Sequence, residues 1–203
     1  MNLIEKQFQE SKQFFRTHKT KNIKFRKQQL KLLSKSIKAH ETDLLESLKI
    51  DLGKSSVEAY ATEIGMLLKS IKTARKELKR WAKTQQVDTP LFMFPSKSYI
   101  KPEPYGTVLI IGPFNYPVQL LFEPLIGAIA AGNNAIIKPS ELTPHVAQVV
   151  RKVIEDIFAS DYVAIIEGGV EETKTLINLP FDYMFFTGSE NVGRIVYQAA
   201  SKI

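Results

Sequence analysis

The segment IIGPFNYPVQ, residues 110–119, places one asparagine, Asn115, between two prolines where an apolar run ends. Proline fixes its own φ angle and biases the preceding residue towards an extended backbone. Pro113 and Pro117 therefore predict a stiffened loop that holds a single side-chain amide. Because a structural turn needs only Asn or Gly, we interpret this amide as a group that meets a ligand at a set position.

The segment FFTGSENVGR, residues 185–194, is typical of a strand, a glycine loop and a helix start, where free backbone N–H groups suit a phosphate. Gly188 and Gly193 have the spacing of a nucleoside-triphosphate loop, but Arg194 and Ile195 replace its lysine and hydroxyl. The dinucleotide fingerprint G-x-G-x-x-G also fails, because position 190 is Glu. The pattern alone leaves a phosphate site and a plain structural turn both open.

The segment AIIKPSE places two charged residues, Lys138 and Glu141, directly after an apolar run. Both side chains could simply be solvated. Pro139 between them and their position at the carboxyl end of a strand favour presentation to a ligand. A lysine ammonium donates to hydroxyls and a carboxylate accepts from a diol such as a ribose, so the pair is a candidate ribose site.

The sequence has no cysteine, which excludes disulfides, thiolate metal sites and cysteine nucleophiles within these 203 residues. The histidines at positions 18, 40 and 145 have no metal-ligand spacing and are interpreted as surface residues. No metal site is expected. Glu171 and Glu172 follow a glycine pair and favour the start of a helix.

The N-terminus is charged and has no apolar core of a signal peptide, and Glu123 and Pro124 interrupt the longest apolar stretch, residues 116–132. No membrane segment is expected, because a spanning helix needs about 20 apolar residues. We expect a cytoplasmic protein.

The net charge of +7 is unevenly distributed along the chain. Residues 1–105 hold 22 Lys and Arg against 11 Asp and Glu, whereas residues 106–203 hold 6 against 10. A basic half can indicate nucleic-acid binding. The lysines alternate with apolar residues at helical spacing, however, which favours the solvated faces of amphipathic helices and no nucleic-acid partner.

The first part of the chain, residues 1–86, has apolar residues at helical spacing and predicts a helical section. Its helices are expected near residues 4–15, 23–37 and 44–52, with Gly53 ending the third, and a long one follows over 57–81. Residues 87–105 are rich in proline and predict a linker and an edge hairpin.

From residue 106 onward, short apolar runs alternate with helical patterns four times. The runs TVLIIG, NAIIKPSE, YVAII and FDYMFFT predict strands, and helices are expected over 117–131, 143–158, 171–178 and 190–202, with Thr143 and Pro144 opening the second. The alternation predicts an α/β fold with an open parallel sheet and right-handed crossovers. Ligands gather at the carboxyl ends of such strands, where all the unusual residues fall.

Taken in order, these stretches resemble the aldehyde dehydrogenase family, especially its class 3 branch. The matching segments are KRWAKTQQVDTPLFMFPSKSYIKPEPYGTVLIIGPFNYP, AAGNNAIIKPSELTP, EGGVEET and FFTGSENVGRIV. The resemblance spans the whole chain and implies a Rossmann-like fold over residues 106–203, truncated relative to the family. It also implies that the hairpin in residues 87–105 is an oligomerisation element of a homo-oligomer. The implied cofactor is NAD or NADP, held without the usual fingerprint.

The resemblance also implies roles for single residues. Asn115 matches the family's oxyanion asparagine, which stabilises the hemithioacetal formed when a cysteine thiolate attacks the aldehyde. The resemblance further implies that the backbone around Ile111 and Pro113 lines the cofactor cleft. It implies that Lys138 and Glu141 meet the adenosine ribose. The residues implied to face the pyrophosphate and adenine side are Gly188, Ser189, Val192 and Gly193.

The chain departs from the family in one large respect, because the cysteine nucleophile and the glutamate base lie in a part that these residues do not contain. One hypothesis is the N-terminal, cofactor-binding part of an NAD(P)-dependent enzyme that oxidises aldehydes to carboxylic acids, inactive in isolation. A second is a non-catalytic nucleotide-binding or subunit-interaction module left by gene truncation. The partner would then be a second copy or the missing C-terminal part.

Overall fold

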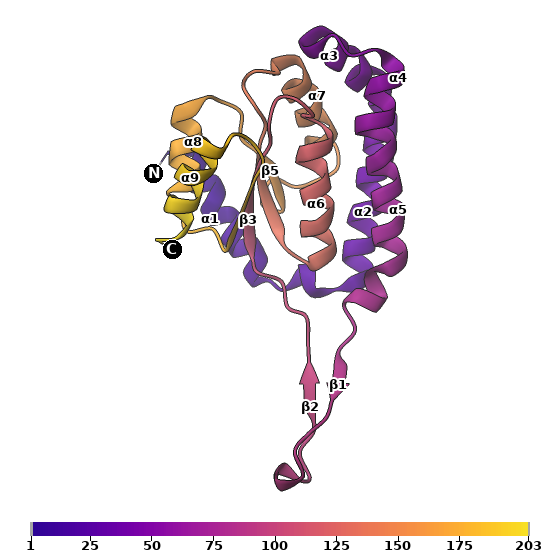
Figure 1. Ribbon diagram of the computed structural model, residues 1–203, viewed down its shortest axis with the longest axis vertical. Coiled ribbons are helices and arrows are strands. Elements are labelled where there is room, and N and C mark those ends of the chain that lie inside the picture. The colour runs from indigo at the N-terminus through magenta and orange to yellow at the C-terminus, as the bar shows by residue number, and fades with distance from the viewer. Residues whose placement is uncertain (1, 203) are drawn as a thin grey trace.

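A four-stranded parallel sheet forms the centre of the computed structural model, which describes residues 2–202 (Figure 1). Its strands are β3 (Thr107–Ile111), β4 (Asn134–Lys138), β5 (Val163–Ile165) and β6 (Tyr183–Phe186), in the order β5-β4-β3-β6. The predicted parallel sheet is therefore confirmed. The chain adds β4 and β5 on one side of β3 and then crosses to β6 on the other, so the strand order reverses between β3 and β6.

Helices cover both faces of the sheet (Figure 1). One face carries α6 (Gln119–Ala131) and α7 (Pro144–Glu155), and the other carries α1 (Leu3–Arg16), α8 (Val170–Ile177) and α9 (Glu190–Ala200). Two apolar clusters hold these layers together. Val108 and Ile110 belong to the first cluster and Leu109 and Ile111 to the second, as expected for a strand with alternating side chains that is buried on both faces.

One helix of the section predicted over residues 1–86, α1, lies on the opposite face of the sheet, and the remaining helical section packs outside α6 and α7. It comprises α2 (Ile23–Ala39), α3 (Glu41–Leu52), α4 (Ser56–Ala59) and α5 (Gly65–Trp81), and a π-helical turn, Tyr60–Ile64, joins the last two into one continuous helical stretch. This confirms the long helix predicted from the apolar spacing. Gly53 ends α3 with a left-handed φ of 69°, as its position predicted.

A two-stranded antiparallel hairpin extends away from the body of the molecule (Figure 1). Its strands are β1 (Gln85–Val87) and β2 (Ser98–Ile100), and a 3₁₀ turn, Leu91–Met93, lies at its tip. The expected section boundary at residue 86 falls inside β1. The expected edge hairpin pairs with itself in the described chain and not with an edge of the main sheet, because β1 supplies the partner for β2.

The start of α7 differs from expectation in one respect. Pro144 occupies the first turn as predicted, but the hydroxyl of Thr143 makes no capping hydrogen bond. Asp51, at the end of α3, instead accepts a hydrogen bond of 2.8 Å from the backbone N–H of Val146. The cap comes from a residue 95 positions upstream, which no local pattern reveals. Across residues 2–202, no helix is both long and apolar enough to cross a membrane.

Candidate functional site

The candidate site lies at the carboxyl ends of β3, β4 and β6. Ile111, the last residue of β3, stands in register with Lys138 of β4 and Phe186 of β6. Two further backbone hydrogen bonds tie these strand ends together, from Gly112 N–H to the Lys138 carbonyl at 3.0 Å and from Thr187 N–H to the Ile111 carbonyl at 3.2 Å. The three loops that leave these strands therefore start from one rigid edge.

The loop after β3 presents Asn115 to solvent. The side-chain oxygen of Asn115 accepts a hydrogen bond of 3.0 Å from the backbone N–H of Tyr116. Because this bond occupies the amide oxygen, the Nδ2 group is the free end of the side chain, and it bonds to no group within residues 2–202. Pro113 is half-buried and Pro117 is buried, so both prolines anchor the loop. The arrangement offers an oriented N–H donor.

A buried ion pair that the sequence analysis missed braces this loop. Lys54, between α3 and α4, places Nζ 2.5 Å from Oε1 of Glu63 and 2.9 Å from the backbone carbonyl of Asn115. Its ammonium also lies 4.0 Å from the centroid of the Tyr116 ring, within range of a cation–π contact.

The other oxygen of Glu63 binds the start of α6. Oε2 accepts from the backbone N–H groups of Val118 at 2.8 Å and Gln119 at 3.2 Å. The side chain of Glu63 is fully buried. The carboxylate therefore links the π-helical turn, Lys54 and the first residues of α6, and it holds the exit of the Asn115 loop. Sequence spacing gave no signal, because the partners are about 55 residues apart and surface glutamates are common.

Lys138 is the second group that the structure brings to this edge. Its relative exposure is 1%, and its Nζ donates to the Pro139 carbonyl at 2.8 Å and to Oε2 of Glu141 at 3.3 Å. Lysine is seldom fully buried unless it is paired. The structure thus rejects the alternative of a solvated Lys138, whereas the side chain of Glu141 stays exposed. A cavity of about 180 Å³ opens next to Glu141 and the turn after β5.

The turn between β6 and α9 borders a hollow of about 520 Å³, whose lining includes Gly188, Ser189 and Gly193. A Cβ added to Gly188 would lie 2.4 Å from the Phe186 ring, so this position accepts only glycine without a shift. Ser189 is the N-cap of α9 and accepts a weak hydrogen bond from Val192 N–H at 3.5 Å. Val192 is exposed, and the first turn of α9 directs backbone N–H groups towards this end of the helix.

The turn after β5 completes the edge. Glu172 accepts a hydrogen bond of 2.7 Å from the Gly169 N–H and so caps α8. Hydrogen bonds from the backbone N–H groups of Glu172 itself and of Gly169 lower the pKa of the Glu172 carboxyl. This confirms that the acidic pair favours the start of a helix.

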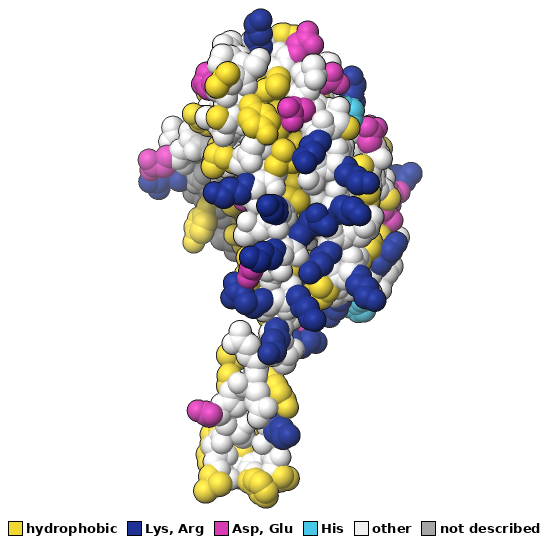
Figure 2. Space-filling view, turned by 90° about the vertical axis from the view of Figure 1, so that its right-hand side faces the viewer, with side chains coloured by type: hydrophobic (Ala, Val, Ile, Leu, Met, Phe, Trp, Pro, Cys, Tyr) yellow, Lys and Arg dark blue, Asp and Glu magenta, His cyan; other side chains and the backbone are white. Residues whose placement is uncertain are grey.

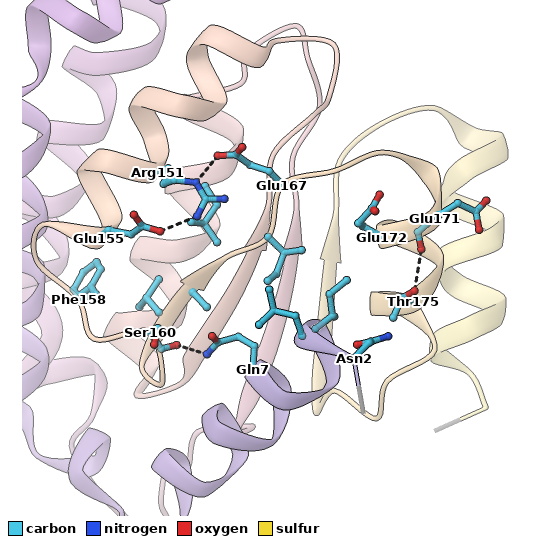
Figure 3. Close-up of a pocket in the computed structure, with 16 residues that line it drawn as sticks. Asn2, Gln7, Arg151, Glu155, Phe158, Ser160, Glu167, Glu171, Glu172 and Thr175 are labelled. Atoms are coloured by element: carbon cyan, nitrogen blue, oxygen red, sulfur yellow. Dashed lines mark hydrogen bonds and ion pairs between the residues drawn. The ribbon is translucent and has the colours of Figure 1, made fainter.

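A separate cavity of about 580 Å³ lies beside the edge strand β5, between α1, α7 and α8 (Figure 3). Arg151 at its rim donates to Glu167 and Glu155, each at 2.7 Å, and Gln7 donates to the Ser160 carbonyl at 2.8 Å. These polar groups bond to one another, and none of the predicted site residues lines the cavity. We therefore place the candidate site at the strand ends.

The histidines contribute nothing to the candidate site. His18 and His145 are exposed, whereas His40 is only partly so and bonds to Asp156 at 2.8 Å. Within residues 2–202, no cluster of three or more His, Cys, Asp or Glu side chains could hold a metal ion.

The comparisons with known proteins point in one direction. A model described as "Aldehyde dehydrogenase family" matches residues 2–203. The chain is 71% identical, over all of its length, to a 4,4'-diaponeurosporen-aldehyde dehydrogenase of Staphylococcus aureus, of which it covers 44%. It is 41% identical over 98% of its length to aldehyde dehydrogenase family 3 member A2 of Macaca fascicularis, covering 41% of that protein. The chain thus spans less than half the length of these relatives.

Solved structures give the same fold. A substrate-bound AldH of Staphylococcus aureus superposes with a TM-score of 0.98 at 71% identity, and the match covers all of this chain and 44% of that one. A betaine aldehyde dehydrogenase of the same organism, solved with NAD⁺, superposes with a TM-score of 0.86 at 23% identity, with 98% of this chain and 40% of that one covered. The second match shows likeness of fold alone.

Proposed function

The chain belongs to the aldehyde dehydrogenase family, and we propose that it is the cofactor-binding part of an NAD(P)-dependent enzyme that oxidises aldehydes to carboxylic acids. The observation that carries this proposal is the convergence of three loops on one sheet edge. Asn115 follows β3, Lys138 and Glu141 follow β4, and Gly188 follows β6. This edge includes the reversal of strand order, where open α/β sheets bind their ligands.

The residues at this edge fit a dinucleotide. The hollow at Gly188 is kept open by the missing Cβ, and the first turn of α9 offers N–H donors of the kind that bind phosphate. Lys138 and Glu141 offer a donor and an acceptor to a ribose diol, and Val192 offers apolar surface to a base. Ser189 and Gly193 line the hollow together with Phe186. Ile111 stands in register with Phe186 on the neighbouring strand, and Pro113 follows it in the loop after β3. When bound, NAD(P) would supply the hydride acceptor.

Asn115 is proposed to stabilise an oxyanion. Its amide oxygen is held by Tyr116 N–H, so its Nδ2 is the end that can donate to a developing negative charge. One such donor is worth roughly 3–4 kcal/mol of barrier in acyl-transfer enzymes, provided that it is fixed before the reaction starts. The two prolines and the Lys54–Glu63 pair would meet that requirement.

We expect these 203 residues to be inactive alone, because they contain no cysteine to attack the aldehyde. A second candidate is a non-catalytic module that binds a nucleotide or another subunit, and the same lack of a nucleophile favours it. Aldehyde-dependent NADH formation by the purified chain would exclude both the expected inactivity and the module.

Cofactor binding is tested by calorimetric titration of the purified chain with NAD and, separately, with NADP. We expect Lys138→Met to weaken binding by about tenfold or more, because a hydrogen bond from a charged donor contributes about 1.5–3 kcal/mol. Lys152→Met, which alters an exposed lysine on α7, is the matched control. No heat at millimolar cofactor with the folded wild-type chain would contradict a competent site.

The catalytic proposal needs the longer polypeptide. The relative at 71% identity supports 4,4'-diaponeurosporen-aldehyde as the first aldehyde to test. In a longer protein that contains a cysteine nucleophile, Asn115→Ala should lower kcat by about 100-fold or more, in line with loss of one oxyanion donor. If kcat is unchanged, Asn115 is not the oxyanion donor.

A further inference from the structure

Two rows of lysines cover one face of the helical section. On α2 the row is Lys24, Lys27, Lys31, Lys35 and Lys38, and on α5 it is Lys69, Lys72, Lys76 and Lys79. Steps of three and four residues keep each row on one side of its helix. All but Lys27 are exposed. Because α2 and α5 pack against each other, the rows form one surface, which Figure 2 shows as a dense array of cationic side chains.

The charge of this lysine face is not balanced by the protein. Residues 23–39 and 65–81 together hold 12 Lys and Arg against a single acid, Glu77, which Arg80 binds at 2.7 Å. The chain as a whole has a net charge of +7, so the remainder is acidic on balance. In residues 2–202, none of the nine lysines has a carboxylate within 4 Å.

Several cations on other faces are paired with carboxylates. Lys12 lies 2.8 Å from Asp182, Lys174 lies 2.8 Å from Glu171, and Arg194 lies 2.6 Å from Glu190. Uncompensated like charges on neighbouring turns of a helix repel one another and destabilise it slightly. A folded protein that concentrates such charges on one face has a surface suited to an anionic partner.

We propose that the lysine face of α2 and α5 docks this protein onto an anionic lipid bilayer. A row of five lysines over about four helical turns is about 20 Å long, and a second row lies beside it at the usual 8–10 Å interhelical spacing. Such a broad array can approach a plane of headgroups with several ammonium groups at once. Attraction of this kind falls off within a Debye length, so it requires contact and is sensitive to salt.

The composition of the face favours a bilayer over a nucleic acid. All nine members of the rows are lysines, which are strongly hydrated point charges that need no fixed partner geometry. Nucleic-acid recognition relies more on arginine forks and on aromatic side chains that stack with bases. Arg26 points inward to the Ala130 carbonyl, Arg75 is only partly exposed, and Arg80 is bound by Glu77. Trp81, at one end of the rows, is the exposed aromatic side chain of these two helices.

The test is co-sedimentation of the purified chain with vesicles of equal parts phosphatidylglycerol and phosphatidylcholine, and with phosphatidylcholine alone. We expect binding to the anionic vesicles only, weakening as the ionic strength rises from about 0.01 M to about 0.15 M. Each lysine near an anionic surface contributes about fivefold in affinity. The variant Lys31→Glu, Lys35→Glu, Lys72→Glu, Lys76→Glu should therefore bind at least about 100-fold more weakly.

The matched control is Lys6→Glu, Lys97→Glu, Lys152→Glu, Lys174→Glu, which changes the net charge equally but leaves the face intact and should keep most of the binding. If the first variant unfolds by circular dichroism, the same four positions changed to Gln replace it. Equal loss in both variants overturns the proposal, as does binding to neither kind of vesicle. Tighter binding to a duplex DNA oligonucleotide than to anionic vesicles also overturns it. The NAD titration is independent of all these outcomes.

Discussion

The Asn115 loop and the turn between β6 and α9 end neighbouring strands of one sheet, yet they are held in different ways. The first depends on Lys54 and Glu63, whose side chains come from the helical section and are almost fully buried. The second is held by Ser189, which caps the helix that directly follows it, and by Gly188, which clears the Phe186 ring. The loop proposed to meet the reacting atoms is held by residues that are distant in the sequence. The turn proposed to meet phosphate is held by residues of its own segment.

The difference fits the roles proposed for the two loops. A phosphate site needs backbone N–H groups, which any well-formed helix start supplies. A side-chain amide that meets a developing charge must be fixed in place beforehand, and a loop with two prolines still has an entry and an exit that can move. Glu63 and Lys54 restrict the exit and the middle of the loop, because the carboxylate binds the start of α6 and the ammonium binds the carbonyl of Asn115.

The largest expected effect comes from breaking the distant brace. Glu63→Gln leaves the Lys54 ammonium buried without a charged partner, which we expect to lower the free energy of unfolding by about 3–5 kcal/mol. Urea unfolding measures this loss of stability. The control is Glu58→Gln, which changes an exposed glutamate on α4. Hydrogen exchange should speed up most at the backbone N–H of Val118, which donates a hydrogen bond to Glu63. A loss below about 1 kcal/mol with unchanged exchange would show that the loop is held without the pair.

A smaller effect is expected from the local cap. Ser189→Ala should lower the free energy of unfolding by about 1 kcal/mol, because an N-cap side chain satisfies one N–H of the first helical turn. Ser189→Thr keeps a hydroxyl and should retain most of the free energy of unfolding that the cap contributes. Thermal unfolding of the three proteins measures the effect. If Ser189→Ala costs as much as Glu63→Gln, the contrast between local and distant support fails.

The smallest expected effect is the pH dependence of the third turn. The pKa of Glu172 is lowered in the folded state, so its stabilising contribution is fully present above its ordinary pKa of about 4.3 and is lost as the pH falls through the lower folded value. Glu172→Gln should therefore flatten the acid side of the stability curve. Glu171→Gln, which leaves the cap at Gly169 in place, should not. Carboxyl NMR titration checks the pKa directly, and an ordinary value for Glu172 would contradict this prediction.

Much of the candidate site could be predicted from the sequence, because its loops follow strands that the short apolar runs indicate. The short apolar runs located all four strands, and their parallel order brought Ile111, Lys138 and Gly188 to one edge. The burial of Lys138 was not foreseen, since a charged residue after a strand is exposed in most proteins. The cap of α7 was assigned to Thr143, although Asp51 supplies it.

The sequence by itself determined the local backbone of this protein: which segments are helices and strands, where Gly53 and Gly132 end helices, and which face of each element is apolar. These properties depend on neighbours within a few residues, so spacing encodes them. Only the tertiary structure decided which distant charges meet and which lie side by side. The pairing of Lys54 with Glu63, and the alignment of two lysine rows into one face, depend on how whole helices pack, and no local pattern carries that information.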